Sequence, residues 1–332
     1  MTVEIRVRSV KPLRQSFTHL AQRFGDKPAS RYQEGAYDIQ STTNFHYKPL
    51  WDPERDLWDA RRTALTMADW YALKDPRQYY YGSWTIARAR QQDAADRQLE
   101  MVEQRGQLAR LPEPARHELQ QVLLPLRHVE WAANTNFAYV SAYGYGTALT
   151  QAAAMAMMDR LGQAQHHSRI GLLLDGQTGR SLAEAKRQWL THPAWQPLRG
   201  ALEASFVSRD WAQTLLAQTL CDTLLHSLLL RDWEADFSHR HGSAVLATVL
   251  DFPLRWHEDH GRWIDALLKT LAAENEANRA QLADWAGQWG ARLGEALVPI
   301  AELALGSEAP AALDRAREAL ARRLTKAGIV RS

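Results

Sequence analysis

Histidine offers the most scope for chemistry in this sequence, because twelve histidines are spread over 332 residues. His257 and His260 are three positions apart, a spacing that places two imidazoles on one face of a helix, where they could bind a metal ion. The residues between them, Glu258 and Asp259, are charged, which is typical of a face in contact with water. We therefore interpret the pair as part of a solvated surface, with a metal site as the alternative.

Other familiar catalytic arrangements are missing. The sequence contains no HExxH zinc motif, no GxSxG nucleophile elbow and no GxxxxGK[ST] phosphate loop. Cys221 stands alone in the apolar run LAQTLCDTLL, so we expect a small buried hydrophobic residue and not a nucleophile. A single cysteine excludes an intrachain disulfide and a cysteine-ligated metal cluster, and it is typical of a reducing compartment.

For a helical protein, the metal-binding pattern to search for is that of a diiron site. Such a site takes one Glu from each of two helices and a Glu-x-x-His pair from each of the other two, because the i, i+3 spacing directs both side chains at one metal. No Glu-x-x-His occurs anywhere in the sequence. We therefore expect this chain to have no catalytic residue, no cofactor site and no metal site of its own.

The chain has two parts with different patterns. Residues 1–75 contain four prolines and ten large aromatic residues without a sustained helical or strand period, and we predict an extended, irregular N-terminal arm. The aromatic side chains must be buried, either on the chain's own helical body or on a partner subunit. Phe45, Trp51 and Trp58 are the candidate anchors because they flank prolines that stiffen the backbone.

After the arm, apolar residues recur at helical spacing, which predicts an all-α bundle. Asp75 and Pro76 predict the start of its first helix, and Ser181 with Glu184 predicts a capping box at a later one. We assign residues 1–75 to the arm, 76–305 to the helical domain and 306–332 to a C-terminal helix and tail.

Composition excludes several classes of function. A net charge of +2 lacks the strong excess of basic residues that is typical of nucleic-acid-binding proteins. The first residues, MTVEIRVRSV, lack the apolar segment of a signal peptide, and the richest apolar runs are far shorter than the roughly 20 residues of a membrane span. We expect a cytoplasmic protein that binds neither nucleic acid nor a membrane.

Several long strings in the sequence resemble one family, the β subunits of bacterial multicomponent phenol hydroxylases and of the related toluene 2-monooxygenases. The resemblance runs through nearly the whole chain. Its most specific strings are RFGDKPASRYQE (23–34), TNFHYKPLWDP (43–53), DPRQYYYG (75–82), LPLRHVE (124–130), MMDRLG (157–162), SRIGLLLDG (168–176) and AENEANR (273–279). This resemblance implies a ferritin-like bundle related to that of the catalytic, diiron α subunit.

The resemblance also implies where iron ligands have been lost. Glu130 looks like the lone Glu of the first half-site, while Arg160 and Gln163 stand where the relative has Glu and His. In the second half-site, Pro253 and Trp256 fall at ligand positions, and its lone Glu would fall near Thr219. We predict that Arg160 pairs with Glu130 in the interior; the simpler alternative is a Glu130 carboxylate satisfied by a neighbour in sequence.

By resemblance, the chain is a non-catalytic subunit of an NADH-dependent aromatic monooxygenase. The diiron centre would belong to the α subunit, and α, β and a small γ subunit would assemble as (αβγ)₂. A reductase with FAD and an iron–sulfur cluster would supply electrons, and a small regulatory protein would assist. Two alternatives are a free helical scaffold and an autonomous ferritin-like protein with an unrecognised metal site.

Overall fold

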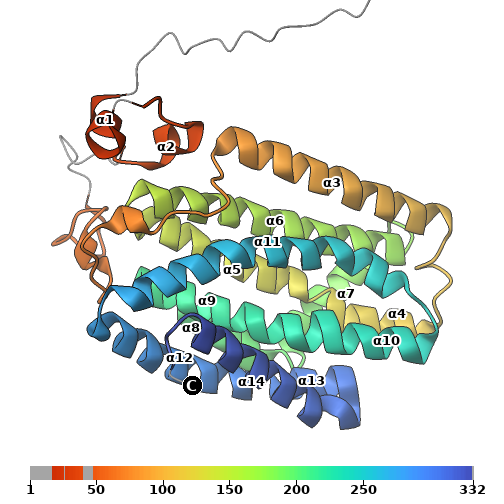
Figure 1. Ribbon diagram of the computed structural model, residues 1–332. Coiled ribbons are helices and arrows are strands. Elements are labelled where there is room, and N and C mark those ends of the chain that lie inside the picture. Colours follow the sequence, from red (N-terminus) through yellow and green to blue (C-terminus); the bar gives the residue numbers. More distant parts are fainter. Residues whose placement is uncertain (1–16, 26, 40–47, 331–332) are drawn as a thin grey trace, which may run out of the picture.

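The structure, a computed structural model, describes residues 17–25, 27–39 and 48–330, and these residues form helices, turns and loops without a strand. Long helices run roughly parallel or antiparallel to one another along the molecule (Figure 1). The predicted all-α class is therefore confirmed, and the arrangement is a ferritin-like helical bundle with one main hydrophobic core.

Four helices form the centre of the bundle: α5 (Leu126–Tyr143), α6 (Thr147–Leu174), α9 (Trp211–Leu225) and α11 (Val245–Glu274). Helix α9 contacts α5, α12 and α14, and all but two of its side chains are buried. A helix that is buried on nearly every side belongs in the core of a large bundle. The middle of α9 is therefore shielded from solvent by its neighbours.

Helices α5 and α6 form an antiparallel hairpin that turns at two glycines. A Cβ atom on Gly144 would lie 2.6 Å from the carbonyl oxygen of Val140, and Gly146 has φ of 91°, a conformation that favours glycine. The chain can reverse within three residues because neither position carries a side chain.

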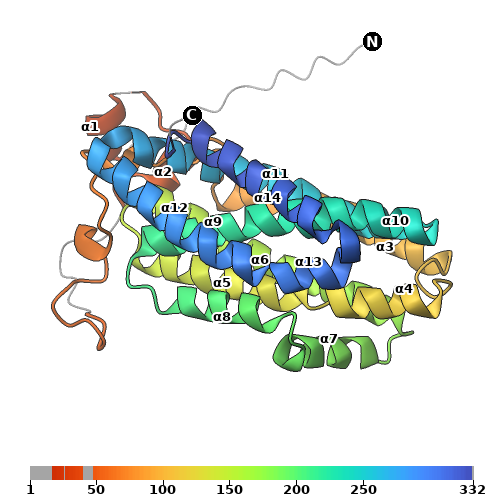
Figure 2. The same ribbon diagram turned by 90° about the horizontal axis from the view of Figure 1, so that it is seen from below.

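Further helices surround this centre. They are α3 (Tyr81–Gln104), α4 (Glu113–Glu118), α7 (Arg180–Thr191), α8 (Gln196–Phe206), α10 (Glu234–His241), α12 (Glu276–Ala296), α13 (Val298–Leu305) and α14 (Ala309–Lys326). Seen from below, α12, α13 and α14 lie together on the side of α9 (Figure 2). Two stretches are π-helical, η3 (Leu119–Leu123) and η4 (His226–Trp233), and η4 continues α9 without a break.

The described part of the arm is more ordered than an extended segment. It contains α1 (Thr18–Phe24), α2 (Arg31–Ala36) and the 3₁₀ turns η1 (Ala60–Arg62) and η2 (Trp70–Ala72). Tyr32 and Tyr37 are buried against Ala148 of α6. For these two rings the chain's own body is the packing surface, and the prediction of a wholly irregular arm is wrong there.

Two predicted helix starts are wrong. Asp75 accepts a hydrogen bond from the backbone N–H of Arg77 and forms a turn, so α3 begins only at Tyr81. Ser181 does not cap α7, because the carboxylate of Asp175 accepts hydrogen bonds from the N–H groups of Thr178 and Ser181 and the helix begins at Arg180. In both places a nearby Asp side chain binds backbone N–H groups that the prediction had assigned otherwise.

One helical stretch passes a length and composition test for a membrane span, Glu276–Lys326, with half of its apolar window buried inside the protein. This stretch is not one helix, since it comprises α12, α13 and α14. Buried core helices pass the same test, and the packing of α12 and α14 on α9 accounts for the apolar residues.

Candidate functional site

A fully buried arginine lies at the centre of the four-helix core. Arg160 of α6 donates a hydrogen bond from Nη1 to Oε2 of Glu130 on α5 at 2.9 Å, and its Nη2 contacts the carboxylate of Asp222 on α9. Arg160 is 0% exposed, Glu130 8% and Asp222 8%. We call these three residues the interior cluster. The predicted pairing of Glu130 with Arg160 is confirmed.

Aromatic rings enclose the guanidinium group. Its central carbon lies 4.5 Å from the ring centroid of Trp256 on α11 and 5.7 Å from that of Phe137 on α5. The indole N–H of Trp256 donates to Asp159 at 2.9 Å, which fixes the ring in place. His260 also stacks on Trp256, with ring centroids 4.5 Å apart. The cation is thus held by two carboxylates and by the faces of aromatic rings.

The charges of the interior cluster do not balance, since two carboxylates share one cation. Burial raises the pKa of Glu130 and of Asp222, although Arg160 acts in the opposite direction. Burial alone would lower the pKa of Arg160, but attraction to Asp222 and Glu130 raises it. The guanidinium therefore stays charged, whereas burial and the shared cation act in opposite directions on the two carboxyl groups, and burial is the larger effect on their pKa values.

Histidines adjoin the interior cluster. A cavity of about 20 Å³, close to the size of one water molecule, is lined by His167, His226, His257, Glu130, Asp222, Pro253 and four aliphatic residues. Burial lowers the pKa of His167 to about 3 and that of His226 to about 4. These imidazoles are neutral near pH 7. Within the described residues, no group of three or more His, Cys, Asp or Glu side chains is arranged to hold a metal ion.

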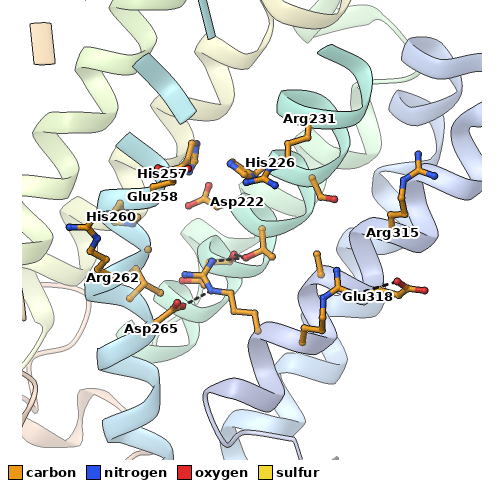
Figure 3. Close-up of a pocket in the computed structure, with 18 of the residues that line it drawn as sticks. Asp222, His226, Arg231, His257, Glu258, His260, Arg262, Asp265, Arg315 and Glu318 are labelled. Carbon is orange, nitrogen blue, oxygen red and sulfur yellow. Dashed lines mark hydrogen bonds and ion pairs between the residues drawn. The ribbon is translucent and has the colours of Figure 1, made fainter. Parts of the chain in front are cut away.

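A groove on the surface leads to the same residues. Asp222, His226 and His257, which line the small cavity, also line this groove of about 660 Å³ between α9, η4, α11 and α14 (Figure 3). On the α14 side, Arg323 donates to Asp265 at 2.7 Å and to Thr223 at 2.8 Å. Asp222, a member of the interior cluster, therefore forms part of the wall of this groove, although its side chain is only 9% exposed.

The prediction of a solvated face at His257 and His260 is wrong. His260 is only 4% exposed and lies between the rings of Trp256 and Phe137, while His257 is partly buried beside His226. The charged neighbour Asp259 points to α3, where it binds Arg88 at 3.0 Å. Burial lowers the pKa of both histidines well below the usual value.

The remaining predicted ligand positions have different surroundings. Gln163 is 1% exposed, and neither polar atom of its amide has a hydrogen-bond partner among the described residues. Pro253 is buried in α11 at the cavity. Thr219 hydrogen-bonds its own helix through Leu215, and the carboxylate on α9 that faces Arg160 is Asp222, one turn further on. Sequence reasoning missed Asp222.

A second group of charges lies nearer the surface, under α3. Arg88 binds Asp159 at 2.8 Å and Asp259 at 3.0 Å, and Arg77 binds Asp259 at 3.3 Å. We call these four residues the α3 cluster. Their side chains are 5–14% exposed. Asp159 joins the two clusters, because it also accepts the hydrogen bond from the indole of Trp256.

Two remaining candidates concern a thiol and the arm. Cys221 is fully buried, and burial raises the pKa of its thiol well above the usual value, so the thiol stays protonated and unreactive. Trp51 is 46% exposed and packs edge-on against Tyr143, with ring centroids 5.2 Å apart. Trp58 is partly buried, and Phe45 lies outside the described residues.

Comparison with known proteins gives a consistent result. Residues 51–275 match the Methane/Phenol/Alkene Hydroxylase family. The chain is 47% identical over 330 residues to the phenol 2-monooxygenase oxygenase component DmpL of Pseudomonas sp. (strain CF600), covering 99% of this chain and 98% of that one. It is 24% identical over 296 residues to the hydroxylase component subunit beta of the toluene-4-monooxygenase system of Ectopseudomonas mendocina, covering 85% and 87%. A crystal structure of phenol hydroxylase from Pseudomonas sp. OX1 superposes with a TM-score of 0.92 at 40% identity, covering 98% of both chains.

Proposed function

The chain belongs to the methane, phenol and alkene hydroxylase family as a subunit of a multicomponent monooxygenase, and from this premise we propose that it is the non-catalytic β subunit of an NADH-dependent phenol or toluene hydroxylase. Its role is to support a diiron α subunit that hydroxylates an aromatic ring with O₂. The proposed assembly is (αβγ)₂, served by a regulatory protein and by an FAD and iron–sulfur reductase. We place it in the cytoplasm.

The observation that carries the non-catalytic role is the position of Arg160. In a four-helix diiron protein the carboxylates at the centre of the bundle bind iron. Here Arg160 contacts both Glu130 and Asp222 with the two ends of its guanidinium group. A fixed positive charge at this point repels Fe²⁺ and occupies the oxygen atoms that would bind it. Trp256, packed on the same cation, has no side-chain atom that ligates iron.

The interior cluster offers a metal two hard ligands, the carboxylates of Glu130 and Asp222, and both already bind Arg160. The nearby imidazoles come from His167, His226 and His257, which line the adjoining cavity. We propose that Glu130, Arg160, Gln163, Pro253 and Trp256 are degenerate ligand positions, with Asp222 in the place earlier expected near Thr219. The donor set does not fit a diiron centre, so no step of the hydroxylation is assigned to residues of this chain.

The arm, residues 1–75, is the proposed contact with the α subunit. Support comes from apolar side chains that the described arm leaves in solvent, since Leu50 is 97% exposed and Trp51 is 46% exposed. Exposed apolar residues next to a stiffening proline, Pro49, suit a segment that docks on another protein. Phe45, Trp51 and Trp58 are the proposed anchors. Residues 76–305 would form the supporting helical domain, and residues 306–332 the C-terminal helix and tail.

Metal analysis and co-purification test this proposal together. The isolated chain should contain far less than one iron per chain after chelation, whereas the co-expressed α subunit should retain its iron. Deleting residues 1–60 should leave a helical body by circular dichroism and abolish recovery of the α subunit.

Two outcomes contradict the proposal. Close to two iron atoms per isolated chain, retained after chelation, would establish an autonomous metalloprotein. A full-length chain that never recovers a diiron subunit would point to a free scaffold. If the truncated chain recovers the α subunit as well as the full-length chain does, the arm packs on its own bundle and the α subunit is bound elsewhere.

A further inference from the structure

A pocket at the edge of the bundle is walled mainly by rings. It lies between α5, α7 and α8, has a volume of about 180 Å³, and shares no lining residue with the groove beside α14 or with the cavity at the interior cluster. Figure 2 shows α7 and α8 at the edge of the bundle beside α5. His128 and Trp131 are on one face of α5, whereas Glu130 faces the interior. We call this site the aromatic pocket; its rings belong to His128, Trp131, Trp189 and Phe206.

The rings of the aromatic pocket are held by contacts with one another and with the core. The His128 imidazole stacks on Trp189, with ring centroids 5.7 Å apart and an angle of 18° between the planes. Trp131 meets Phe206 edge-on, with centroids 6.4 Å apart. Trp189 also packs on Trp195, which is fully buried. The walls stand on three helices and are formed before a ligand arrives, so binding costs little ordering of the protein.

The volume and the wall limit the ligand to a molecule with one ring. An apolar cavity of about 150 Å³ holds one benzene molecule, whereas pockets for drug-sized ligands have roughly 300–1,000 Å³. Ala132, Leu190 and Leu202 supply aliphatic wall between the rings. A flat aromatic ligand gains ring-to-ring contacts here that an aliphatic ring of equal size does not. The groove beside α14, by contrast, is lined by many charged side chains and does not suit such a ligand.

One polar atom of a lining residue lacks a partner. Nε2 of His128 is shielded from solvent and has no hydrogen-bond partner among the described residues. Burial, together with the positive charges of Arg127 and Lys186, lowers the pKa of His128 to about 4, so the imidazole is neutral near pH 7. A neutral imidazole nitrogen donates or accepts according to its tautomer, and a hydroxyl group can do both. A hydroxyl group on the ligand would therefore satisfy Nε2 in either tautomer.

The charges at the pocket disfavour organic cations, the other class of ligand that aromatic rings attract. Lys186 lines the pocket and, with Arg127, places positive charge near His128. The acidic residue among those that line the pocket, Glu203, already binds Arg199 at 2.7 Å. A cation would meet repulsion and no free carboxylate, whereas a neutral ring meets neither problem.

We propose that the aromatic pocket binds a phenol, that is, a single aromatic ring with a hydroxyl group. The ring lies among the two tryptophans and Phe206, and the hydroxyl group hydrogen-bonds Nε2 of His128. The inference goes beyond the proposed function, because it gives a subunit without catalytic residues a small-molecule site of its own. It needs no partner chain, since α5, α7 and α8 supply every lining residue.

Ligand-observed NMR titrations of the full-length chain test the proposal with three probes. They are phenol, toluene, which lacks the hydroxyl group, and cyclohexanol, which lacks the aromatic ring. For a ligand of this size we expect phenol to bind with a Kd on the order of 1 mM. Cyclohexanol should bind at least about threefold more weakly, because it loses the contacts between rings.

Variants place the ligand in the pocket. His128→Phe keeps a ring on Trp189 but removes the nitrogen, so it should weaken phenol binding about fivefold and change toluene binding less than about twofold. Trp131→Ala removes a wall that is 56% exposed, so the fold should be unaffected while both ligands bind at least about threefold more weakly. Tyr81→Ala, at an exposed aromatic residue of α3, is the control and should change neither. Melting curves should show that every variant is folded.

Several results would overturn the inference. The pocket does not hold phenol if binding fails to saturate up to about 10 mM, or if neither His128→Phe nor Trp131→Ala changes it. Equal losses of phenol and toluene in His128→Phe would refute the hydrogen bond to the hydroxyl group. Loss of phenol binding when the chain is co-purified with its catalytic subunit would show that a side chain of the partner fills the pocket. Because the titrations use this chain alone, their failure would leave the proposed function intact.

Discussion

The interior cluster and the α3 cluster contain the same kinds of charge but differ in the exposure of their arginines and in the number of arginines that bind the carboxylates. In the first, the side chain of Arg160 is 1% exposed and contacts both carboxylates. In the second, Arg88 is 14% exposed, and Arg77 shares the charge of Asp259 with it. The comparison teaches that burial and the number of partners, and not the presence of an ion pair, determine how much a protein depends on one side chain.

The largest expected effect is at Arg160. Arg160→Ala leaves Glu130 and Asp222 buried without a cation, and we expect the free energy of unfolding to fall by about 3–5 kcal/mol in urea denaturation. The triple variant Glu130→Gln, Arg160→Met, Asp222→Asn removes all three charges and should lose less than Arg160→Ala. A loss below about 1 kcal/mol for Arg160→Ala would mean that water enters and solvates the two carboxylates.

The next effect is a pH dependence from His167, which is 2% exposed and has its pKa lowered to about 3. Its neutral form is favoured in the folded state, so its contribution to stability is complete above the unfolded pKa of about 6.5 and is lost as the pH falls toward 3. Between pH 6.5 and 5 we expect a loss of about 2 kcal/mol from this residue.

The His167→Asn variant isolates this contribution. Glu130 and Asp222 have raised pKa values and act in the opposite direction: their contribution is complete below the unfolded pKa and is lost as the pH rises through the folded pKa. The difference between wild type and variant removes these carboxylates from the comparison. If both proteins lose the same free energy between pH 6.5 and 5, His167 becomes protonated in the folded state as easily as in the unfolded one.

The smallest expected effect is at Arg88. In Arg88→Ala, Asp159 keeps the hydrogen bonds from Trp84 and Trp256, and Asp259 keeps Arg77. We expect a loss of about 1–2 kcal/mol, measured by the same denaturation experiment. The exposed pair on α14 supplies the control, because Arg322→Ala should change stability by no more than about 0.5 kcal/mol. A loss at Arg88 as large as that at Arg160 would remove the distinction between the two clusters.

The interior pair could be predicted from sequence, but its third member could not. Glu130 and Arg160 lie in strings that resemble the family without gaps between them. On α9 the resemblance depends on a gap, and the expected position fell on Thr219, one turn before Asp222. A local signal existed: Asp222 is the single acidic residue in the apolar run LAQTLCDTLL, and an acid in such a run needs a buried partner.

Helix periodicity explains the error at His260 as well. The charged residues Glu258 and Asp259 suggested a solvated face, but His260 is four positions after Trp256 and belongs to the same buried stripe of α11. The predicted start of α3 was wrong for a different reason. The Asp75 side chain accepts a hydrogen bond from the N–H of Arg77 and stabilises a turn in place of a helix. Long helices are determined by pattern over many residues, whereas their ends depend on single hydrogen bonds.

The buried thiol of Cys221 makes the chain ready for site-specific labelling. It is the one cysteine in the sequence, and it is inaccessible and held protonated in the folded protein. Any cysteine introduced at the surface would therefore be the only thiol that reacts with a maleimide dye or spin label under native conditions. One label at an exposed position of this chain and one on the partner subunit would allow fluorescence transfer between the two dyes to follow assembly in real time.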